Sequence, residues 1–236
     1  MTITDKGLNL TKQTVAILKS MAGINSIVHV TAGNELVTVS PQKNIMFTAK
    51  VDETFPTEFA IYDLNQFLST YSLLSDAEVV FGENHCVITS GRQSCKYHYA
   101  DTRLVDGCRP PSKLSMPEVK VAFDLPQQEL TDLLRASAVL QLPDIMFTND
   151  EGVVKIVAFD KEKANTTNKY EIEVTPKEML QNCNFKIFIK SENLKILPGD
   201  YEILLHETLA IQMNHADIEA NYILAVTSDS VYNGLL

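Results

Sequence analysis

Several features that mark catalytic or membrane proteins are missing from this sequence. It has no Walker loop, no G-x-G-x-x-G or H-E-x-x-H string, and no serine or cysteine in a nucleophile-elbow string. No stretch approaches the ~20 uncharged apolar residues of a membrane span, and no signal-like apolar block stands at the N-terminus. We therefore expect a soluble, unexported protein without a membrane partner that binds rather than catalyses.

Cysteine is scarce. Cys86, Cys95, Cys108 and Cys183 show no C-x-x-C spacing, which favours reduced thiols in a cytoplasm. A thiol or zinc hydrolase built on Cys86, Cys95 and His98 is one alternative. Within one strand, however, Cys95 and His98 would point to opposite faces, which argues against a shared metal ion. We expect no metal and no cofactor.

Basic residues are too few for a protein that coats nucleic acid. The chain has 20 Lys+Arg against 30 Asp+Glu, a net charge of −10, and 19 of the acidic residues lie in 110–236. Ordinary nucleic-acid binding depends on a basic surface that releases counterions. A nucleic-acid partner would therefore have to be held by something other than a basic surface.

The length and composition fit two folded domains. The 236 residues are 45% hydrophobic and 21% charged, enough to bury a core in each half. The segment RLVDGCRPPSKLSMPE, at 103–118, carries three of the nine prolines and no periodicity, which predicts a connector. We therefore expect an N-terminal domain at 1–102 and a C-terminal domain at 119–236.

One sequence pattern occurs twice in the middle of the chain. FAIYDLNQFLSTYSLLS, at 59–75, and VAFDLPQQELTDLLRAS, at 121–137, each contain a short apolar stretch, then Asp-Leu-x-Gln, then an amphipathic helix. After each helix, apolar and polar residues alternate between turn signals, as in hairpins with one buried face. Each segment therefore predicts a unit of one strand, one helix and three antiparallel strands.

Capping residues predict where these helices start. Asp63 with Gln66, and Asp124 with Gln127, have the spacing of a capping box. Pro126 would lie just inside the second helix, where its missing N–H costs nothing. Similar patterns elsewhere raise the count to four units with a helix each, hence two similar domains; they are LTKQTVAILKSMAG, at 10–23, and the segment beginning FKIFIKSENLKIL, at 185–197.

Repeated units joined by a proline-bearing connector resemble the DNA polymerase sliding clamps. Four strings are similar in order and spacing to those of T-even-type bacteriophage clamps, and the likeness is weak only in 80–118. It implies an α+β DNA-clamp fold of two similar domains, each of two β-α-β-β-β units, with antiparallel sheets outside and helices lining a ring. The strings are AIYDLNQFL (60–68), LLRASAVLQ (133–141), PGDYEILL (198–205) and EANYILAVTSDS (219–230).

This resemblance implies a non-enzymatic function in the cytoplasm of an infected bacterial host. Family clamps are homotrimeric rings that enclose duplex DNA regardless of its sequence, tether the phage DNA polymerase, and are loaded by a clamp loader complex. They also support late transcription with a sigma factor and a co-activator. Enclosure would make the net charge of −10 compatible with a DNA partner, because a ring that surrounds DNA needs little basic surface to hold it. The main alternative is an oligomeric, β-rich virion structural or assembly protein without DNA binding.

The resemblance also implies two groups of residues that contact other molecules. Basic side chains on the helices of the four units would face DNA: Lys12, Lys19, Arg135, Lys190 and Lys195. An apolar pocket would take the short tails of partner proteins: Leu114, Met116, Leu209, Ile223 and Ala225.

A third group would join the subunits through two unpaired strand edges. Lys96 and His98 of one edge would face Glu171 and Glu173 of the other, and each such pair contributes about 0.2–1 kcal/mol. The first edge is formed by Cys95, Lys96, Tyr97, His98 and Tyr99, and the second by Lys169, Tyr170, Glu171, Ile172 and Glu173.

Overall fold

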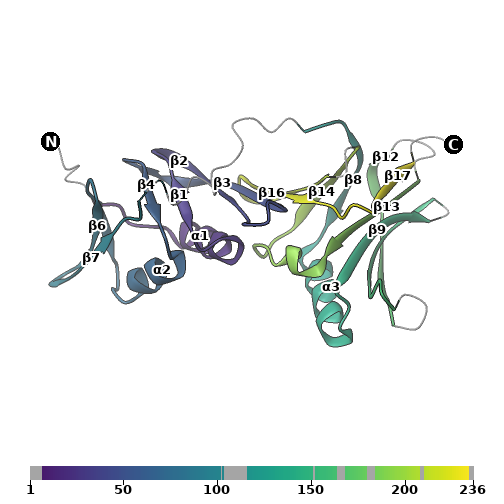
Figure 1. The fold of residues 1–236 in the computed structure, drawn as a ribbon, viewed down its shortest axis with the longest axis horizontal. Helices are drawn as coiled ribbons and strands as arrows, with labels where there is room; N and C mark the ends of the chain where they lie inside the picture. Colours follow the sequence, from purple (N-terminus) through teal and green to yellow (C-terminus); the bar gives the residue numbers. More distant parts are fainter. Residues whose placement is uncertain are drawn as a thin grey trace. The chain divides into compact units, whose positions relative to one another are not determined.

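The structure is a computed structural model that describes residues 7–101, 103, 116–150, 152–163, 168–179, 184–207 and 210–233 (Figure 1). The chain divides into two compact units, Met1–Ser112 and Lys113–Leu236. Most of the predicted connector lies outside the described residues. Among the described residues, no helix has both the length and the apolarity to cross a membrane.

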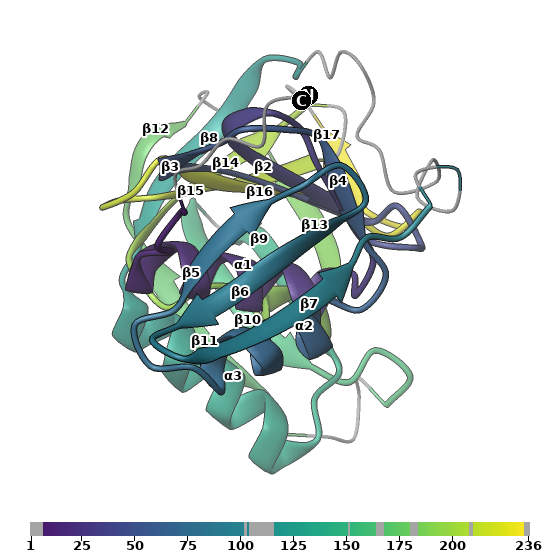
Figure 2. The same ribbon diagram turned by 90° about the vertical axis from the view of Figure 1, so that its left-hand side faces the viewer.

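In its described residues, the first unit contains two α-helices and three small groups of antiparallel strands. β1 pairs with β4, β2 with β3, and β5, β6 and β7 form a sheet in that order, with β7 at one edge (Figure 2). The elements are α1 (Lys12–Ile24), β1 (Val28–Val30), β2 (Gly33–Val39), β3 (Ile45–Phe55), β4 (Phe59–Ile61), α2 (Leu64–Ser72), β5 (Glu78–Phe81), β6 (His85–Ser90) and β7 (Gln93–His98).

The two helices of this unit lie side by side and cover one face of its strands (Figure 1). α1 buries Ile17, Leu18 and Met21 on one side, because these positions recur at helical spacing. α2 begins as its sequence predicts: the Asp63 side chain accepts a hydrogen bond from the Gln66 N–H at 3.0 Å.

The described part of the second unit contains one α-helix and two antiparallel groups of strands. One sheet has the order β11-β10-β9-β13-β17, and within this unit β12, β8, β14, β15 and β16 are successive neighbours. The elements are β8 (Val119–Leu125), α3 (Gln127–Leu140), β9 (Asp144–Asp150), β10 (Val153–Phe159), β11 (Tyr170–Val174), β12 (Pro176–Met179), β13 (Asn184–Lys190), η3 (Ser191–Leu194), β14 (Tyr201–His206), β15 (Ala210–His215), β16 (Ala220–Ala225) and β17 (Val231–Asn233).

The α+β class and the antiparallel sheets are thus confirmed. In the second and third predicted units, the order of one strand, one helix and three strands is complete: β4-α2-β5-β6-β7 and β8-α3-β9-β10-β11. α3 packs on β10 and β11 with Leu130 and Leu133 buried. The unit's core also contains Phe123 and Phe147, whose ring centroids lie 6.3 Å apart.

The predicted capping box of α3 is wrong. Asp124 belongs to β8, and its carboxylate forms an ion pair with Lys177 at 2.6 Å. Pro126 is itself the N-cap residue and supplies no side-chain acceptor. The Asp200 carboxylate accepts the Gln127 N–H instead, at 2.7 Å. The hydrogen-bond acceptor for the first N–H of α3 therefore comes from a residue 73 positions away in the sequence, and not from Asp124.

The predicted fourth α-helix is also different in the structure. SENL, at Ser191–Leu194, forms a single turn of 3-10 helix between β13 and the loop before β14. Asn193 and Leu194 are buried in this turn, and Ile196 donates its N–H to the Leu194 carbonyl. Pro198 and Gly199 follow within five residues, so too little chain remains for a longer helix.

Candidate functional surfaces

The exposed side of α1 carries two lysines. Lys12 and Lys19 are both exposed and are seven positions apart, hence nearly aligned along the helix, on the side away from buried Leu18 and Met21. No carboxylate of the described residues forms an ion pair with either ammonium. α1 therefore presents two positive charges to solvent, as the sequence predicts.

A buried carboxylate fixes the start of this helix. Glu53 of β3 is 7% exposed and accepts hydrogen bonds from the Thr11 N–H and the Thr14 hydroxyl. Thr11 also caps the helix through its own hydroxyl, which accepts from the Thr14 N–H at 3.1 Å. A negative charge at a helix N-terminus is favoured by the helix dipole. Glu53 thus attaches the lysine-bearing helix to the strand beneath it.

The other two helices contribute little positive charge. α2 has no basic residue. In α3, Arg135 is exposed, but its Nη1 lies 3.5 Å from Oδ1 of Asp132 one turn earlier. Glu129 in the first turn of α3 adds a further negative charge. The helical surfaces are therefore only weakly basic, in agreement with the sequence.

The two remaining lysines predicted to face DNA do not lie on an α-helix. Lys190 is the last residue of β13, and its ammonium is 2.6 Å from the Asp144 carboxylate, whose side chain is 6% exposed. The hydrogen bond to Asp144 raises the pKa of Lys190. Lys195 follows η3, is exposed, and lines a cavity of about 450 Å³ together with Glu192 and Asp160. Lys190 is thus held by a structural ion pair.

The structure describes three of the five predicted partner-pocket residues. Leu114 and Leu209 lie outside the described residues. Ile223 is half-buried and Ala225 exposed on one face of β16, since alternate strand residues share a face. Met116 is half-buried just before β8.

The strands predicted to join subunits are both sheet edges. β7 ends the order β5-β6-β7, and β11 ends the order β11-β10-β9-β13-β17. Lys96 and His98 are exposed on β7, and Glu171 and Glu173 are exposed on β11. Tyr99 follows β7, and its N–H donates to the Asn84 carbonyl at 3.1 Å.

The opposite faces of these edge strands point toward helices. Tyr97 packs edge-on against Phe67 of α2, with ring centroids 5.3 Å apart, and its hydroxyl donates to the Asp63 carbonyl at 3.1 Å. In β11, Ile172 is half-buried and Val174 is buried on the face that α3 covers. Each edge therefore has a helix side and a charged side.

The thiol and metal alternative has little support in this geometry. Cys86 is buried, and burial raises the pKa of its thiol to about 12, so the reactive thiolate is disfavoured. Cys95 pairs with Ile88 across the β6–β7 ladder, whereas Cys86 pairs with Tyr97. Among the described residues, no group of three or more His, Cys, Asp or Glu side chains could hold a metal ion.

Sequence reasoning missed one site in the first unit. A cavity of about 430 Å³ lies at the end of β7 and has three carboxylates in its lining, those of Glu58, Glu83 and Asp101. They come from three segments, each with an ordinary surface composition. No local pattern connects them, so only the folded chain shows the site.

Solved structures show the class of protein that this fold defines. A. fulgidus PCNA, in a structure titled "C-terminal region of FEN-1 bound to A. fulgidus PCNA", aligns with a TM-score of 0.69 over 95% of this chain and 99% of that chain, at 13% identity. PCNA from Thermococcus kodakaraensis aligns with a TM-score of 0.66 over 92% and 96%, at 12% identity. The fold is that of the DNA sliding clamps.

Sequence comparisons identify the family within that class. Residues 122–228 match the family model "gp45 sliding clamp, C terminal", and residues 11–93 match "DNA polymerase processivity factor". The sliding clamp of Vibrio phage KVP40 is 33% identical over 203 residues, covering 84% of this chain and 90% of the relative. That of Escherichia phage RB69 is 29% identical over 233 residues, covering 96% and 100%. This chain belongs to the bacteriophage sliding clamp family.

Proposed function

We propose that this protein closes into a homotrimeric ring around duplex DNA and tethers the phage DNA polymerase to its template. The observation that carries this proposal is the pair of edge strands, one in each unit. An exposed edge presents unpaired N–H and C=O groups, which a second chain can satisfy. Joining β7 of one subunit to β11 of the next is a head-to-tail contact, and such contacts close into a ring when the rotation per step allows it.

The side chains on the two edges fit such a joint. When β7 and β11 pair in one shared sheet, the faces that point toward helices lie on the same side of that sheet. The charged faces then also share a side, and the basic residues of β7 come next to the acidic residues of the neighbouring β11: Lys96, His98, Glu171 and Glu173. Glu171 already lies 3.9 Å from Lys155 of its own chain, so the cross-subunit attraction is shared. Pairs of this kind contribute about 0.2–1 kcal/mol each. Most of the association would therefore come from strand pairing and apolar burial.

The ring would hold DNA by enclosure rather than by affinity. Lys12 and Lys19 supply positive potential on the helix side, and Arg135, with its charge shared with Asp132, adds less. A weakly basic channel keeps a duplex centred without binding its phosphates tightly, so the ring can slide along the DNA. A net charge of −10 is then compatible with function on DNA.

The partner assignments follow from membership in the family. We assign the face of β16 with Ile223 and Ala225, together with Met116 and the undescribed Leu114 and Leu209, to the apolar tails of the polymerase and of a clamp loader complex. Docking of a sigma factor and a co-activator for late transcription would use the same face. The role is non-enzymatic, and its place is the cytoplasm of the infected host.

Native mass with and without circular DNA tests the proposal. We expect a trimer and, after loading onto nicked circular plasmid by the cognate loader, a protein–DNA complex that survives high salt but is lost when the plasmid is linearised. Enclosure by topology predicts this difference, because the ring can slide off a free end. A stable monomer at all concentrations, or an open polymer indifferent to DNA, would favour a virion assembly role instead.

A further inference from the structure

The cavity at the end of β7 lies where the chain leaves that strand. The Tyr99 N–H donates to Asn84 in the turn between β5 and β6, and the Ala100 N–H donates to Ala60 of β4 at 2.8 Å. The first bond continues the β6–β7 pairing by one residue, and the second joins the end of β7 to β4 of the β1-β4 pair. The cavity of about 430 Å³ opens at this junction. It therefore lies next to the first residues beyond the exposed edge.

The lining of this cavity suits a long cationic side chain. Tyr99 stacks on Phe59, with ring centroids 5.2 Å apart, and both aromatic residues are among those that line the cavity. Glu58, Glu83 and Asp101 add three acidic residues to its lining. A lysine can pack its methylene chain against an aromatic ring such as that of Tyr99 while its ammonium contacts carboxylates.

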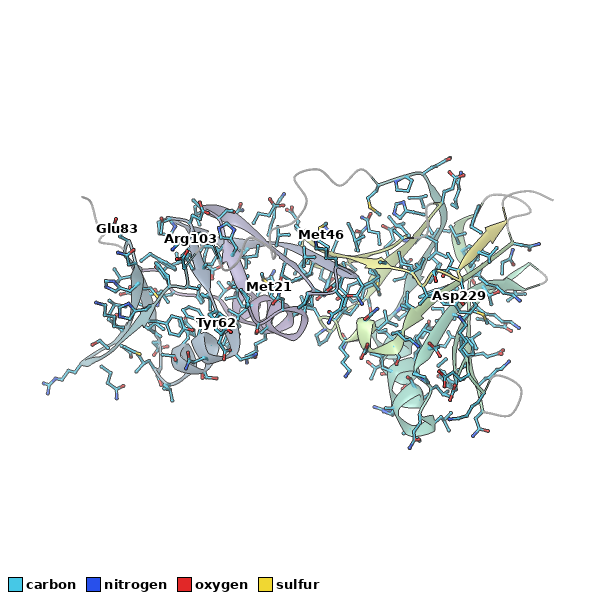
Figure 3. All side chains as sticks on the ribbon, in the orientation of Figure 1. Met21, Met46, Tyr62, Glu83, Arg103 and Asp229 are labelled. Carbon is cyan, nitrogen blue, oxygen red and sulfur yellow. The ribbon has the colours of Figure 1, made fainter. Side chains whose placement is uncertain are left out.

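Two of the three carboxylates have partners within the subunit. His29 lies 2.6 Å from Glu58, and Arg103 pairs with Asp101 at 2.5 Å. The hydrogen bond from Arg103 lowers the pKa of Asp101 to about 2, so this carboxylate stays ionised. Figure 3 labels Glu83, in the turn before β6, and Arg103, just beyond β7. Glu83 is exposed and forms no ion pair among the described residues, so the site keeps an excess of negative charge.

The register of the subunit joint selects the side chain that would reach this cavity. In an antiparallel pair, each step forward on one strand is a step backward on the other. If Lys96 lies opposite Glu173 and His98 opposite Glu171, then Lys169, just before β11, comes level with Ala100, just beyond β7. The Ala100 N–H is already bonded to Ala60, so Lys169 would reach this position by its side chain and not by strand pairing. A parallel joint with Lys96 opposite Glu171 would instead place Lys169 next to Ser94, away from the cavity.

Lys169 is the available cation at the start of β11. It is exposed and forms no ion pair with any described residue. The other lysines before this strand are engaged: Lys161 pairs with Asp229, and Lys163 pairs with Asp160 at 3.1 Å. Lys169 can therefore enter a neighbouring subunit without breaking an ion pair of its own.

We propose that Lys169 of one subunit inserts into the acidic cavity formed by Glu58, Glu83 and Asp101 of the next subunit. The site is incomplete in a single chain, since its cation comes from a second copy. It fixes the antiparallel direction and the register of the β7–β11 joint, which the backbone hydrogen bonds alone leave free to slip by two residues. This proposal rests on the proposed ring.

A charge-swap cycle tests the contact. The variants are Lys169→Glu, Glu83→Lys and the two combined, with Lys186→Glu, at an exposed lysine of β13, as the matched control. The measured quantity is the subunit dissociation constant, from sedimentation at several concentrations. We expect each single swap to weaken association about tenfold, equivalent to ~1.4 kcal/mol, and the double swap to return it to within about threefold of wild type.

The outcomes separate this inference from the ring itself. A wild-type chain that stays monomeric overturns the proposed ring. A trimeric wild type whose two single swaps act additively, with no rescue in the double variant, leaves the ring in place and overturns the contact. An equal loss in the Lys186→Glu control would show that only total charge matters, which also refutes the contact.

Carbodiimide cross-linking of the wild-type trimer gives a direct second test. The reagent joins a lysine amine to a carboxylate in contact with it. In trimers reassembled from ¹⁴N- and ¹⁵N-labelled subunits, we expect mixed-isotope peptides joining Lys169 to Glu83 or Asp101. Lys169 joined across subunits only to carboxylates outside the cavity, or not joined at all, would contradict the proposed register.

Discussion

Removing the Glu53 carboxylate should loosen the helix that carries the candidate DNA-facing lysines. Glu53 is 7% exposed and accepts hydrogen bonds from the Thr11 N–H and the Thr14 hydroxyl. A hydrogen bond to a charged group contributes about 1.5–3 kcal/mol, and a negative charge at a helix start about 0.3–1 kcal/mol. Since the two threonines also contact each other, part of this is retained. We expect Glu53→Ala to lower the free energy of unfolding by about 3 kcal/mol.

Two companion variants separate charge from hydrogen bonding. Glu53→Gln keeps one carbonyl oxygen as acceptor and removes the charge, so we expect an intermediate loss of about 1–2 kcal/mol. Asp52→Ala changes an exposed carboxylate on the same strand and should stay within about 0.5 kcal/mol of wild type.

Urea unfolding at a fixed protein concentration measures these differences, because the proposed association of subunits would stabilise the folded chain by mass action. Amide hydrogen exchange adds a local readout: α1 should exchange faster in Glu53→Ala than elements of the second unit. If Glu53→Ala and Asp52→Ala prove equally stable, or if α1 keeps its protection from exchange, the Glu53 carboxylate does not fix the start of the helix.

Three further predictions concern the helices and the thiols. Lys12→Glu combined with Lys19→Glu should shorten polymerase runs in a loader-dependent primer-extension assay while native mass still shows a trimer; unchanged run length would remove α1 from the channel. Asp200→Ala should destabilise the protein by about 1 kcal/mol, because the Gln127 N–H loses its acceptor, and an unaltered urea midpoint would contradict that role. Cys86, with a pKa of about 12, should resist iodoacetamide at pH 8 in the folded protein while half-buried Cys95 reacts; mass spectrometry of the labelled peptides would expose the reverse order.

The contrast between α2 and α3 shows how far local sequence can predict a helix start. Asp63 and Gln66 are three residues apart, so the cap of α2 forms within the segment that the sequence displays. The same residue types at Asp124 and Gln127 do not cap α3, because Asp124 belongs to β8. The Asp200 carboxylate accepts the hydrogen bond from the Gln127 N–H instead. A motif thus predicts a cap only when neighbouring strands leave its first residue free.

The helix surfaces were only partly predictable for a similar reason. Lys12 and Lys19 follow from helical spacing, and the structure has both exposed. Lys190 was expected on a fourth helix, but a chain segment that ends at Pro198 and Gly199 allows only a 3-10 turn. The ion pair of Lys190 with Asp144 joins two neighbouring strands 46 positions apart, and no local pattern indicates it.

The sequence by itself determined the repeated unit, the alternating strands, the cap of α2 and the family, because each depends on residues within a few positions of one another or on the order of strings along the chain. The tertiary structure decided which strands became edges, where Lys190 lies, how α3 is capped, and that Glu58, Glu83 and Asp101 line one cavity. These features depend on distances between segments far apart in the sequence. Such distances are set by the packing of sheets and helices, and no pattern of neighbouring residues contains them.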